Sequence, residues 1–429
     1  MADAARPLLA LLCFLLIAYA LSDNRRKIPW RVVFAGLALS IGLAVVLSGF
    51  SPVKRILLFM SESAHALQTA TDAGSSFVFG YLGGGETPFA VQKPSASFIL
   101  AFRALPMVLT ISALASLFFY WGVLQRVAGA LAWLLRRSMG LNGPLALGAA
   151  VHVFVGMIEA PLLIRPYLAQ MQRGELFALM SCGMAGVAGT VMVIYAGFLA
   201  PFIPDALGHI LIASVIATPA AISIAAIMSP WRLDEDADDA SLMVDHPPAG
   251  PFDAIIRGVA EGVGPLVGIV SVLLTTIALV TLVNIALAQL PPLGGRVVSL
   301  QWIFAWPFRP VAWLIGVPWE ETPVAASLMA TKTVVNEFVA YRAMSELSVD
   351  ALSPKSRLLL TYALCGFANF GSMGILVGGL NAMLPERRAE IARLGLRSIL
   401  SGTMATCTSA TVAGALYDLT SISAAASGS

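Results

Sequence analysis

The chain has 429 residues, of which 58% are hydrophobic and 12% are charged, and its formal net charge is +2. Soluble domains contain roughly a quarter charged residues, so this composition excludes a soluble globular protein and predicts a membrane protein with many spans. The small net charge and the lack of a basic tract argue against a nucleic-acid partner. The four cysteines are isolated and lack the spacing of metal ligands. They are Cys13, Cys182, Cys365 and Cys407.

Two spans are predicted first, Pro7–Ser22 and Trp30–Phe50. The first could be mistaken for a signal peptide. We interpret it as an uncleaved span because Arg25, Arg26 and Lys27 follow it at once. This is the charge order of a span whose far end lies in the cytoplasm.

The segment Pro52–Gly85 places charged residues among spaced apolar ones, which is typical of an amphipathic helix at the membrane interface. A longer span, Ser97–Leu124, follows and is interrupted at Pro106. We expect these spans and the interfacial helix to form an N-terminal scaffold unit, residues 1–139.

Residues 140–228 are predicted to form a first hairpin repeat. Its segment Gly140–Met171 carries His152, Glu159 and Arg165, with Pro161 and Pro166, within an apolar stretch. It is too polar and too broken for a plain span of ~20 residues, so we predict a re-entrant helical hairpin. The spans Leu176–Leu199 and Leu207–Met228 follow it.

Residues 229–262 begin with a hydrophilic, acidic loop that we expect to be solvated, and they continue as an interfacial helix, Phe252–Gly262. Residues 263–312 hold a span, Val263–Leu290, and an aromatic-rich helix near the interface, Trp302–Trp313.

Residues 313–429 are predicted to form the second hairpin repeat. The stretch GVPWEETPVAASLMATKTVVNEFVAY, Gly316–Tyr341, holds three carboxylates, a lysine and two prolines inside an otherwise apolar protein. Ionisable groups at membrane depth are costly and usually face a cavity, a partner or a transported solute. We therefore interpret this stretch as half of a buried polar site. The spans Leu358–Leu380 and Ile399–Leu419 complete the repeat.

The two hairpins look like copies of each other. Gly156–Pro161 reads GMIEAP and Trp319–Pro323 reads WEETP, and a glycine-interrupted span follows each one. Paired broken segments in two halves are the best sequence indication of a transporter site. The fold class predicted is an all-α polytopic membrane protein with about eight transmembrane helices, two re-entrant hairpins in inverted repeats, and interfacial helices.

The distribution of basic residues predicts the orientation in the cytoplasmic membrane. Arg25–Lys27, Arg136–Arg137 and the cluster Arg387–Arg397 can all be cytoplasmic, which places both termini outside. Lys355 and Arg357 then fall on the outer side.

The motifs VGMIEAPLLIRPY, VPWEETPVAASLMATKTVVNEFVAY and CGFANFGSMGILVGGLNAMLPERRAEIARLG resemble the concentrative nucleoside transporter family. The resemblance runs from about Ser97 to Gly414. It implies a homotrimer in which each subunit has a scaffold domain and a mobile transport domain with two hairpins and two unwound spans. It also implies import of nucleosides by cation-coupled symport and alternating access, without a cofactor.

The resemblance assigns roles to individual residues. Glu337 matches a glutamate that binds the ribose hydroxyls, Asn369 and Ser372 match the other ribose contacts, and Phe367 packs beside the sugar. An ionised carboxylate can accept two hydrogen bonds from vicinal hydroxyls, while an amide both donates and accepts. Glu159 matches a glutamate near the nucleobase.

Two departures from the family pattern concern the base end and the sodium site. The usual hairpin tip reads Gly-Gln-Thr-Glu, with the glutamine and threonine on the base edge, whereas Met157 and Ile158 stand here. We place these two residues and Val191 among the substrate contacts. The family's sodium site also uses an asparagine and a serine whose positions, by register, are His152 and Gly186.

The loss of two side-chain oxygens degrades a site for a hard cation, so no metal site is assigned. We predict coupling to protons, with Glu159, Glu337 and His152 as candidate carriers. The alternative is a weakened sodium site held by the carbonyls of Val155 and Val187.

Simpler structural roles remain open for several of these residues. His152 could be a core histidine that donates to a backbone carbonyl, and Lys332 and Glu337 could form a buried ion pair. Glu320 and Glu321 could cap the half-helix that follows them. The interrupting glycines could serve tight helix packing alone.

Other functions also remain open. A related transporter could move a different ribosylated or polyol-like solute. An intramembrane hydrolase could use Glu159, Glu337 and His152 as an acid–base set, although no serine–histidine–acid order and no zinc motif is present. A receptor without transport is a further alternative.

Overall fold

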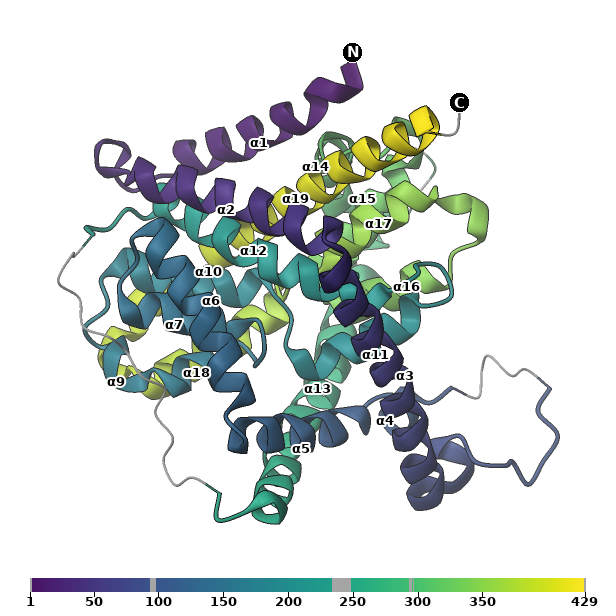
Figure 1. The fold of residues 1–429 in the computed structure, drawn as a ribbon. Helices are drawn as coiled ribbons and strands as arrows, with labels where there is room; N and C mark the ends of the chain where they lie inside the picture. The colour runs from purple at the N-terminus through teal and green to yellow at the C-terminus, as the bar shows by residue number, and fades with distance from the viewer. Residues whose placement is uncertain (1, 93–97, 234–247, 293–294, 296, 428–429) are drawn as a thin grey trace.

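The computed structural model describes residues 2–92, 98–233, 248–292, 295 and 297–427. All the regular elements in these ranges are helices (Figure 1), so the predicted all-α fold class is confirmed. Six helices or helix pairs in this part of the chain are long and apolar enough to cross a membrane. Two shorter apolar helices, Ala5–Ala20 and Phe370–Met383, bring the set to the predicted number of about eight.

The first helices follow the sequence prediction closely. α1 spans Ala2–Ala20 and α2 spans Trp30–Gly49, joined through the short 3-10 helix η1, Arg25–Lys27. The predicted amphipathic segment is one long helix, α3, Ser51–Phe79, and the 3-10 helix η2, Gly80–Gly83, ends it.

The segment after Pro106 contains a helix that the sequence analysis did not predict. A short helix, α4, Leu100–Arg103, precedes α5, Met107–Tyr120, and Pro106 stands at the N-terminal boundary of α5. The additional helix is α6, Val123–Met139. It lies between Gly122 and Gly140, whose φ angles of 72° and 69° place them in the left-handed region that glycine adopts without strain.

The first repeat begins with a helical hairpin. Its helices are α7, Gly143–His152, α8, Glu159–Leu163, and α9, Arg165–Leu168. The side chain of Asn142 accepts a hydrogen bond from the backbone N–H of Leu145 at 2.9 Å and so caps α7.

An interrupted helix follows the hairpin, with halves α10, Arg173–Ala185, and α11, Gly189–Leu199. The continuous helix α12, Ala206–Met228, completes the repeat.

The second repeat has the same order of elements. A 3-10 turn, η4, Trp319–Glu321, leads into the hairpin helices α15, Thr322–Val334, and α16, Glu337–Ser345. The 3-10 helix η5, Val349–Ala351, connects them to an interrupted helix with halves α17, Pro354–Leu364, and α18, Phe370–Met383.

The 3-10 helix η6, Pro385–Arg387, leads to the long helix α19, Arg388–Ser427, which lies along α12 (Figure 1). The predicted span Ile399–Leu419 is therefore the second half of a helix that begins at Arg388.

The region between the repeats corrects one prediction. Phe252–Gly262 is not a separate interfacial helix but the beginning of α13, Pro251–Leu287, a single helix of 37 residues. It continues because the turn-forming signals end before Pro251, which occupies a first-turn position where a proline costs little.

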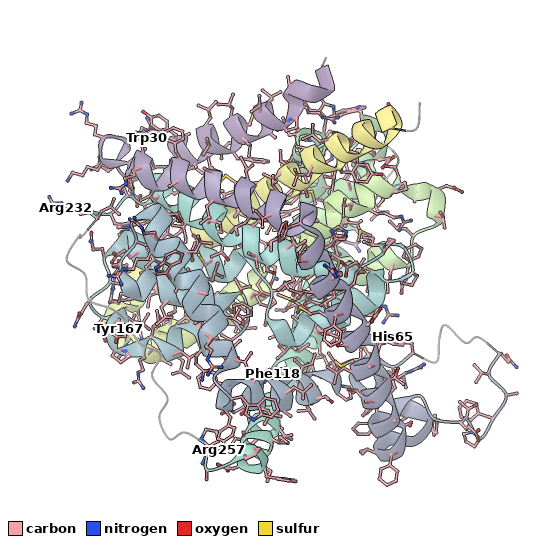
Figure 2. All side chains as sticks on the ribbon, in the orientation of Figure 1. Trp30, His65, Phe118, Tyr167, Arg232 and Arg257 are labelled. Carbon is pink, nitrogen blue, oxygen red and sulfur yellow. The ribbon has the colours of Figure 1, made fainter. Side chains whose placement is uncertain are left out.

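α13 packs against α5, and Figure 2 shows Phe118 on α5 beside it. α14, Leu300–Leu314, then packs on α15. Most of the acidic loop, residues 234–247, lies outside the described residues.

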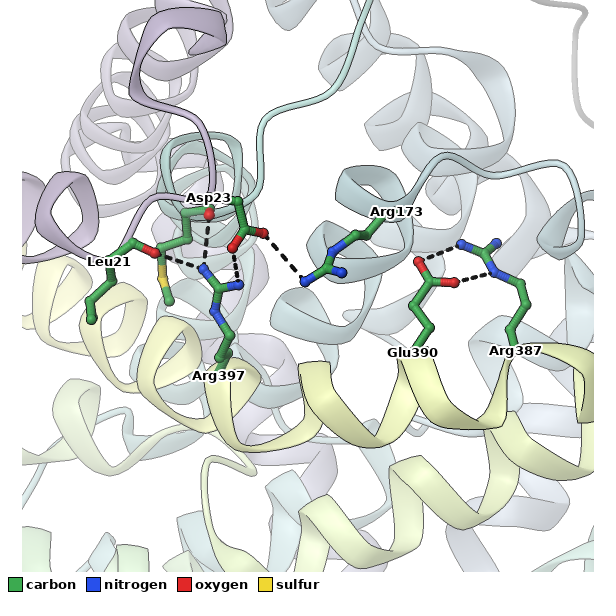
Figure 3. Close-up of polar contacts among 7 residues, drawn as sticks. Leu21, Asp23, Arg173, Arg387, Glu390 and Arg397 are labelled. Atoms are coloured by element: carbon green, nitrogen blue, oxygen red, sulfur yellow. Dashed lines mark hydrogen bonds and ion pairs between the residues drawn. The ribbon is translucent and has the colours of Figure 1, made fainter.

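One arginine on α19 contacts the ends of two other helices (Figure 3). Arg397 Nη1 lies 2.6 Å from Asp23 Oδ1, and its Nη2 donates to the carbonyls of Leu21 at 2.7 Å and Met228 at 2.9 Å. Arg173 adds a longer contact of 3.5 Å to the other carboxylate oxygen of Asp23. Guanidinium groups favour helix C-termini because they satisfy the last carbonyls. The arginine therefore fixes the ends of α1 and α12 to α19.

A second arginine ties the start of α19 to the first hairpin. Arg387 pairs with Glu390 through two contacts of 2.8 and 3.0 Å, and its Nη1 donates to the carbonyls of Leu168 and Met171. The basic cluster predicted to be cytoplasmic thus has a packing role as well.

We predict that Arg397→Lys lowers the apparent melting temperature of the detergent-solubilised protein by about 2–4 °C, because an ammonium cannot reproduce the planar set of donors. The matched control is Arg393→Lys on the exposed face of the same helix. Fluorescence-detected size-exclusion after heating measures both. Equal melting temperatures for the two variants would contradict the role given to Arg397.

Candidate functional site

The two interrupted helices contact each other at their breaks. α10 and α11 are separated at Gly186–Ala188, and α17 and α18 at Cys365–Asn369. The backbone N–H of Phe367 donates to the carbonyl of Gly186 at 3.2 Å. Gly366 lies so close to α10 that an added Cβ would stand 2.7 Å from the Met184 carbonyl oxygen. Broken helices are tolerated in a membrane where such contacts satisfy the freed backbone groups.

The tip of the first hairpin packs against the same region. The N–H of Gly189, the first residue of α11, donates to the carbonyl of Phe154 at 3.3 Å. An added Cβ at Gly189 would lie 2.7 Å from that oxygen, so the hairpin approaches the break at a distance that only glycine permits. Gly186 and Gly366 lie within breaks, whereas Gly183 lies inside α10. The interrupting glycines therefore serve both unwinding and packing.

Glu337 is the buried carboxylate at this junction. It is the first residue of α16 and is 4% exposed. Its Oε1 accepts a hydrogen bond from the Tyr195 hydroxyl of α11 at 2.7 Å, and its Oε2 accepts one from Asn369 Nδ2 at 2.8 Å. Asn369 in turn caps α18, because its Oδ1 accepts from the Ser372 N–H at 2.7 Å. One carboxylate thus connects α11, α16 and α18.

Two helix N-termini partly offset the cost of burying a charge on Glu337. The side chain stands at the N-terminus of α16, and Asn369 places the N-terminus of α18 beside it. Helix N-termini carry partial positive charge. A carboxylate has about four acceptor positions, so two donors leave each oxygen of Glu337 able to accept another hydrogen bond from a polyhydroxyl ligand.

The other predicted sugar contacts lie at the same junction. Ser372 is buried in the first turn of α18, and Phe367 is half-buried in the break itself. Val191, predicted with the substrate contacts, is buried in the first turn of α11.

The tip of the first hairpin presents one carboxylate and two packed apolar side chains. Glu159 starts α8, is exposed, and folds its Oε2 back over Gly156. Met157 is buried beside Gly183, and Ile158 packs on Gly379 of α18. In the described part of the chain, no hydrogen bond joins Glu159 to the Glu337 group.

His152 and Gly186, the two residues that depart from the family pattern, both lie near Gly183 and the break in α10. His152 ends α7 and is 5% exposed. Its Nε2 is buried without a hydrogen-bond partner among the described residues, which does not support a carbonyl partner for that nitrogen. The imidazole lies against Gly183, where an added Cβ would be 2.9 Å from Cε1.

The position of Gly186 has room for a side chain. An added Cβ there would meet only Cys182 O at 3.8 Å and Ser214 Oγ at 4.0 Å, which are ordinary contact distances. Val187 beside it is fully buried, and Val155 in the hairpin tip is half-buried.

Two simpler structural predictions are wrong. Lys332 does not pair with Glu337; its Nζ donates to the Ala363 carbonyl at 2.9 Å and to Thr406 Oγ1 at 3.3 Å. The carbonyl lies at the end of α17, where a cation is favoured. Glu321 does not cap α15 through its side chain; it accepts from the N–H and hydroxyl of Ser353, both at 3.1 Å. Glu320 is exposed.

Tyr195 is the site residue that sequence reasoning missed. It lies in an apolar half-helix directly after the glycine break, and it is 2% exposed. A buried tyrosine hydroxyl needs a hydrogen-bond partner. A lone tyrosine in that position could therefore have indicated a polar group opposite it.

The comparisons with known proteins agree with this architecture. Residues 209–414 match a protein-family model described as "Na+ dependent nucleoside transporter C-terminus". Residues 9–82 match the corresponding model for the N-terminus, and residues 101–202 match a family model described as "Nucleoside recognition". An "Uncharacterized transporter" of Haemophilus influenzae is 34% identical over 421 residues, which cover 96% of this chain and 97% of that protein. The chain belongs to the concentrative nucleoside transporter family.

Other relatives agree with this assignment. "Sodium/nucleoside cotransporter 1" of Mus musculus is 33% identical over 422 residues, which cover 94% of this chain and 62% of the mouse protein. CNTnw in an inward-facing substrate-bound state superposes with a TM-score of 0.84 at 31% identity, covering 97% of this chain and 98% of that one. A CNTnw variant in an intermediate state gives 0.85 at 32% identity, covering 96% and 99%. This family member is a multi-pass inner-membrane transporter rather than an enzyme.

We predict that Gly366→Ala lowers the stability of the protein by about 1–3 kcal/mol, because its methyl group would press on two backbone carbonyls of α10 and force the breaks apart. The control is Gly374→Ala on α18, where an added Cβ has no neighbour within 4 Å. Apparent melting temperatures in detergent measure the difference. A Gly366→Ala protein as stable as the control would show that the breaks do not need this close approach.

Proposed function

We propose that the chain imports nucleosides across the inner membrane by cation-coupled symport and alternating access, and that Glu337 holds the ribose. The observation that carries the proposal is the buried carboxylate at the contact of the two interrupted helices, with a free acceptor position on each oxygen. Two vicinal hydroxyls can donate to these oxygens at once. Membership of a family whose model is described as a Na+ dependent nucleoside transporter supports the same solute class.

The neighbouring residues have distinct tasks in this proposal. Tyr195 and Asn369 each donate one hydrogen bond to Glu337 and fix its orientation before the sugar arrives. The Ser372 hydroxyl is available to a further sugar oxygen, and the ring of Phe367 packs against the sugar face. Fixing the carboxylate in advance reduces the ordering cost of binding.

The base end is proposed to discriminate weakly between nucleobases. Met157, Ile158 and Val191 offer apolar contact rather than hydrogen bonds, and Met157 and Ile158 already pack against α10 and α18. Glu159, exposed at the hairpin tip, is the remaining group that can accept from a base amino group or ring N–H. A solute that carries another group in place of the base would lose little binding free energy at this end. The alternative of a different ribosylated or polyol-like solute therefore changes the expected affinity and leaves the proposed mechanism the same.

We further propose that protons rather than sodium drive uptake. A hard cation prefers oxygen ligands, and the two positions at which the family supplies side-chain oxygens carry an imidazole and no side chain here. His152 places a buried, unpartnered nitrogen beside the break in α10. Its protonation would supply one positive charge near the position that sodium takes in the family. Glu159 and Glu337 are the other candidate carriers.

The scaffold is proposed to centre on α5 and α13, which pack along each other. The exposed apolar face of α13, with Leu274, Leu282 and Ile285 among its members, is the expected contact between subunits of a homotrimer. Residues 1–139 were predicted as one scaffold unit, but the Arg397 contacts tie α1 to α12 and α19. We therefore place α1 with the two repeats, residues 140–228 and 313–429.

Glu337→Gln is expected to reduce the apparent affinity for uridine about tenfold or more, because hydrogen bonds to a charged acceptor contribute roughly 1.5–3 kcal/mol. The control is Glu346→Gln at the other end of α16, an exposed residue paired with Arg342. Uptake of labelled uridine into proteoliposomes gives both values.

A dideoxy analogue completes this test. The wild-type protein should have a higher apparent affinity for uridine than for 2′,3′-dideoxyuridine, which lacks the two hydroxyls. Glu337→Gln should remove most of this difference, because a double-mutant cycle shows little further loss once one partner of a contact is gone. An unchanged preference in the variant would place the ribose elsewhere.

The double variant His152→Asn with Gly186→Ser is expected to make uptake respond to sodium, since it restores the family's two side-chain oxygens and position 186 has room for a serine. Each single variant should respond less. The measurement is uridine uptake against external sodium at constant pH. Full sodium dependence already in the wild-type protein would contradict the proposed coupling and favour the carbonyls of Val155 and Val187.

A further inference from the structure

Lys332 is a buried basic residue to which the proposed function gives no role. It lies in the last turn of α15 and is 2% exposed. A lysine is almost never fully buried unless partners satisfy its charge and its three N–H donors. Its hydrogen-bond acceptors in the described part of the chain are two uncharged oxygens, the Ala363 carbonyl at 2.9 Å and Thr406 Oγ1 at 3.3 Å. These are the surroundings of a bound cation rather than those of an ion pair.

The Ala363 carbonyl is freed by the break in the second interrupted helix. Ala363 lies in the last turn of α17, and the helix does not continue beyond Leu364 to supply a donor. Helix C-termini carry partial negative charge, and secondary transporters with broken helices use such half-helix ends to coordinate cations. The end of α17 is therefore a place for a cation, and the Lys332 ammonium occupies it.

The first repeat brings a nitrogen to the corresponding place. His152 ends α7, the first arm of the first hairpin, and Lys332 lies in the last turn of α15, the first arm of the second. The imidazole lies against Gly183 in the last turn of α10, and the ammonium lies against Ala363 in the last turn of α17. In each repeat, the first arm of the hairpin thus places a basic side chain at the end of the half-helix before the break.

Lys332 also stands near the contact of the two breaks. Thr406, its second acceptor, lies on α19, and an added Cβ at Gly366 would stand 2.9 Å from the Thr406 methyl carbon. The same Cβ would lie 2.7 Å from the Met184 carbonyl oxygen and 3.0 Å from that of Ala185, both in the last turn of α10. The ammonium, Thr406 and Gly366 therefore follow one another from the end of α17 to the end of α10.

The lysine connects the second hairpin to the sugar carboxylate. The tip of this hairpin lies between α15 and α16, and Glu337 is the first residue of α16. Lys332 fixes one side of the tip to the last turn of α17, and Tyr341 fixes the other side by donating to the Thr361 carbonyl of the same turn at 2.7 Å. Loss of the ammonium would therefore loosen the hairpin and the carboxylate that it carries.

We propose that Lys332 is a tethered cation, whose ammonium fills at the break of the second repeat the kind of place that the coupling cation fills at the break of the first. The inference rests on the proposed symport of nucleosides, but not on whether the coupling ion is a proton or sodium. The coupling cation binds and leaves in each cycle, whereas the lysine stays and holds the second hairpin to α17. Lys332 is a positioning residue in this account, and Glu337 is the group that it positions.

The test removes the ammonium and restores it as a free ion. Lys332→Ala removes the charge and leaves space for a small cation, whereas Lys332→Gln removes the charge but keeps an N–H donor. The control is Lys355→Ala at the other end of α17, which breaks an ion pair of 2.6 Å with Asp418. Apparent melting temperatures of the full-length proteins in detergent are measured in choline chloride and in ammonium chloride, at equal pH and ionic strength. Uridine counterflow in proteoliposomes is measured in the same two salts, with equal solutions on both sides.

Both Lys332 variants should melt about 4 °C or more below the wild-type protein in choline chloride, because two buried oxygens lose a charged donor. In ammonium chloride, Lys332→Ala should regain about half of this loss or more, and its counterflow should rise severalfold. Lys332→Gln, whose side chain fills the space, and the Lys355→Ala control should not respond to ammonium.

A Lys332→Gln protein as stable as the wild type would overturn the tethered cation, because a neutral hydrogen-bond donor would then suffice. So would a Lys332→Ala protein that ammonium stabilises no more than it stabilises the control. If Lys332→Ala does not fold, Lys332→Gln decides alone. Absence of uridine counterflow in the wild-type protein would instead contradict the proposed nucleoside transport, and the melting temperatures would still test the lysine.

Discussion

The carboxylate of Glu337 is almost completely buried in a chain that lies in lipid, and it accepts hydrogen bonds from Tyr195 on α11 and Asn369 on α18. A buried charge without partners is strongly unfavourable, so the surrounding helices must bring donors and helix N-termini to it. A continuous helix cannot present its N-terminus at membrane depth. The interruption of α17–α18 and the hairpin α15–α16 both follow from this requirement.

The breaks create a second requirement, because each frees backbone groups that lipid cannot satisfy. Phe367 donates to the carbonyl of Gly186, and Gly189 donates to that of Phe154, so each break is satisfied by another broken element. This mutual dependence explains why the glycines are found where backbones meet. It also places the two halves in contact: hydrogen bonds join the first hairpin to the break in α10–α11, and Tyr195 of α11 to the carboxylate.

Much of this arrangement could be predicted from the sequence. Two segments rich in prolines and ionisable residues identified both hairpins, and the glycines after them identified both interrupted helices, because such residues at membrane depth have few other uses. Glu337, Asn369 and Ser372, which the family motifs assign to the ribose, form one hydrogen-bonded group. The partners of Lys332 and Glu321 could not be predicted, because both are reached across more than thirty residues of sequence. The continuity of α13 was missed because its amphipathic first turns have the composition of an interfacial helix.

The most direct test of the account is the response of the wild-type protein to two separate gradients. Labelled uridine uptake into proteoliposomes should be driven above equilibrium by an acid-outside pH step in sodium-free buffer, and an inward sodium gradient at equal pH should have no such effect. Accumulation driven by sodium alone would show that backbone carbonyls suffice to bind the ion and would contradict the coupling proposed from His152 and Gly186. Failure to accumulate uridine under either gradient would contradict the assignment of a nucleoside as the solute.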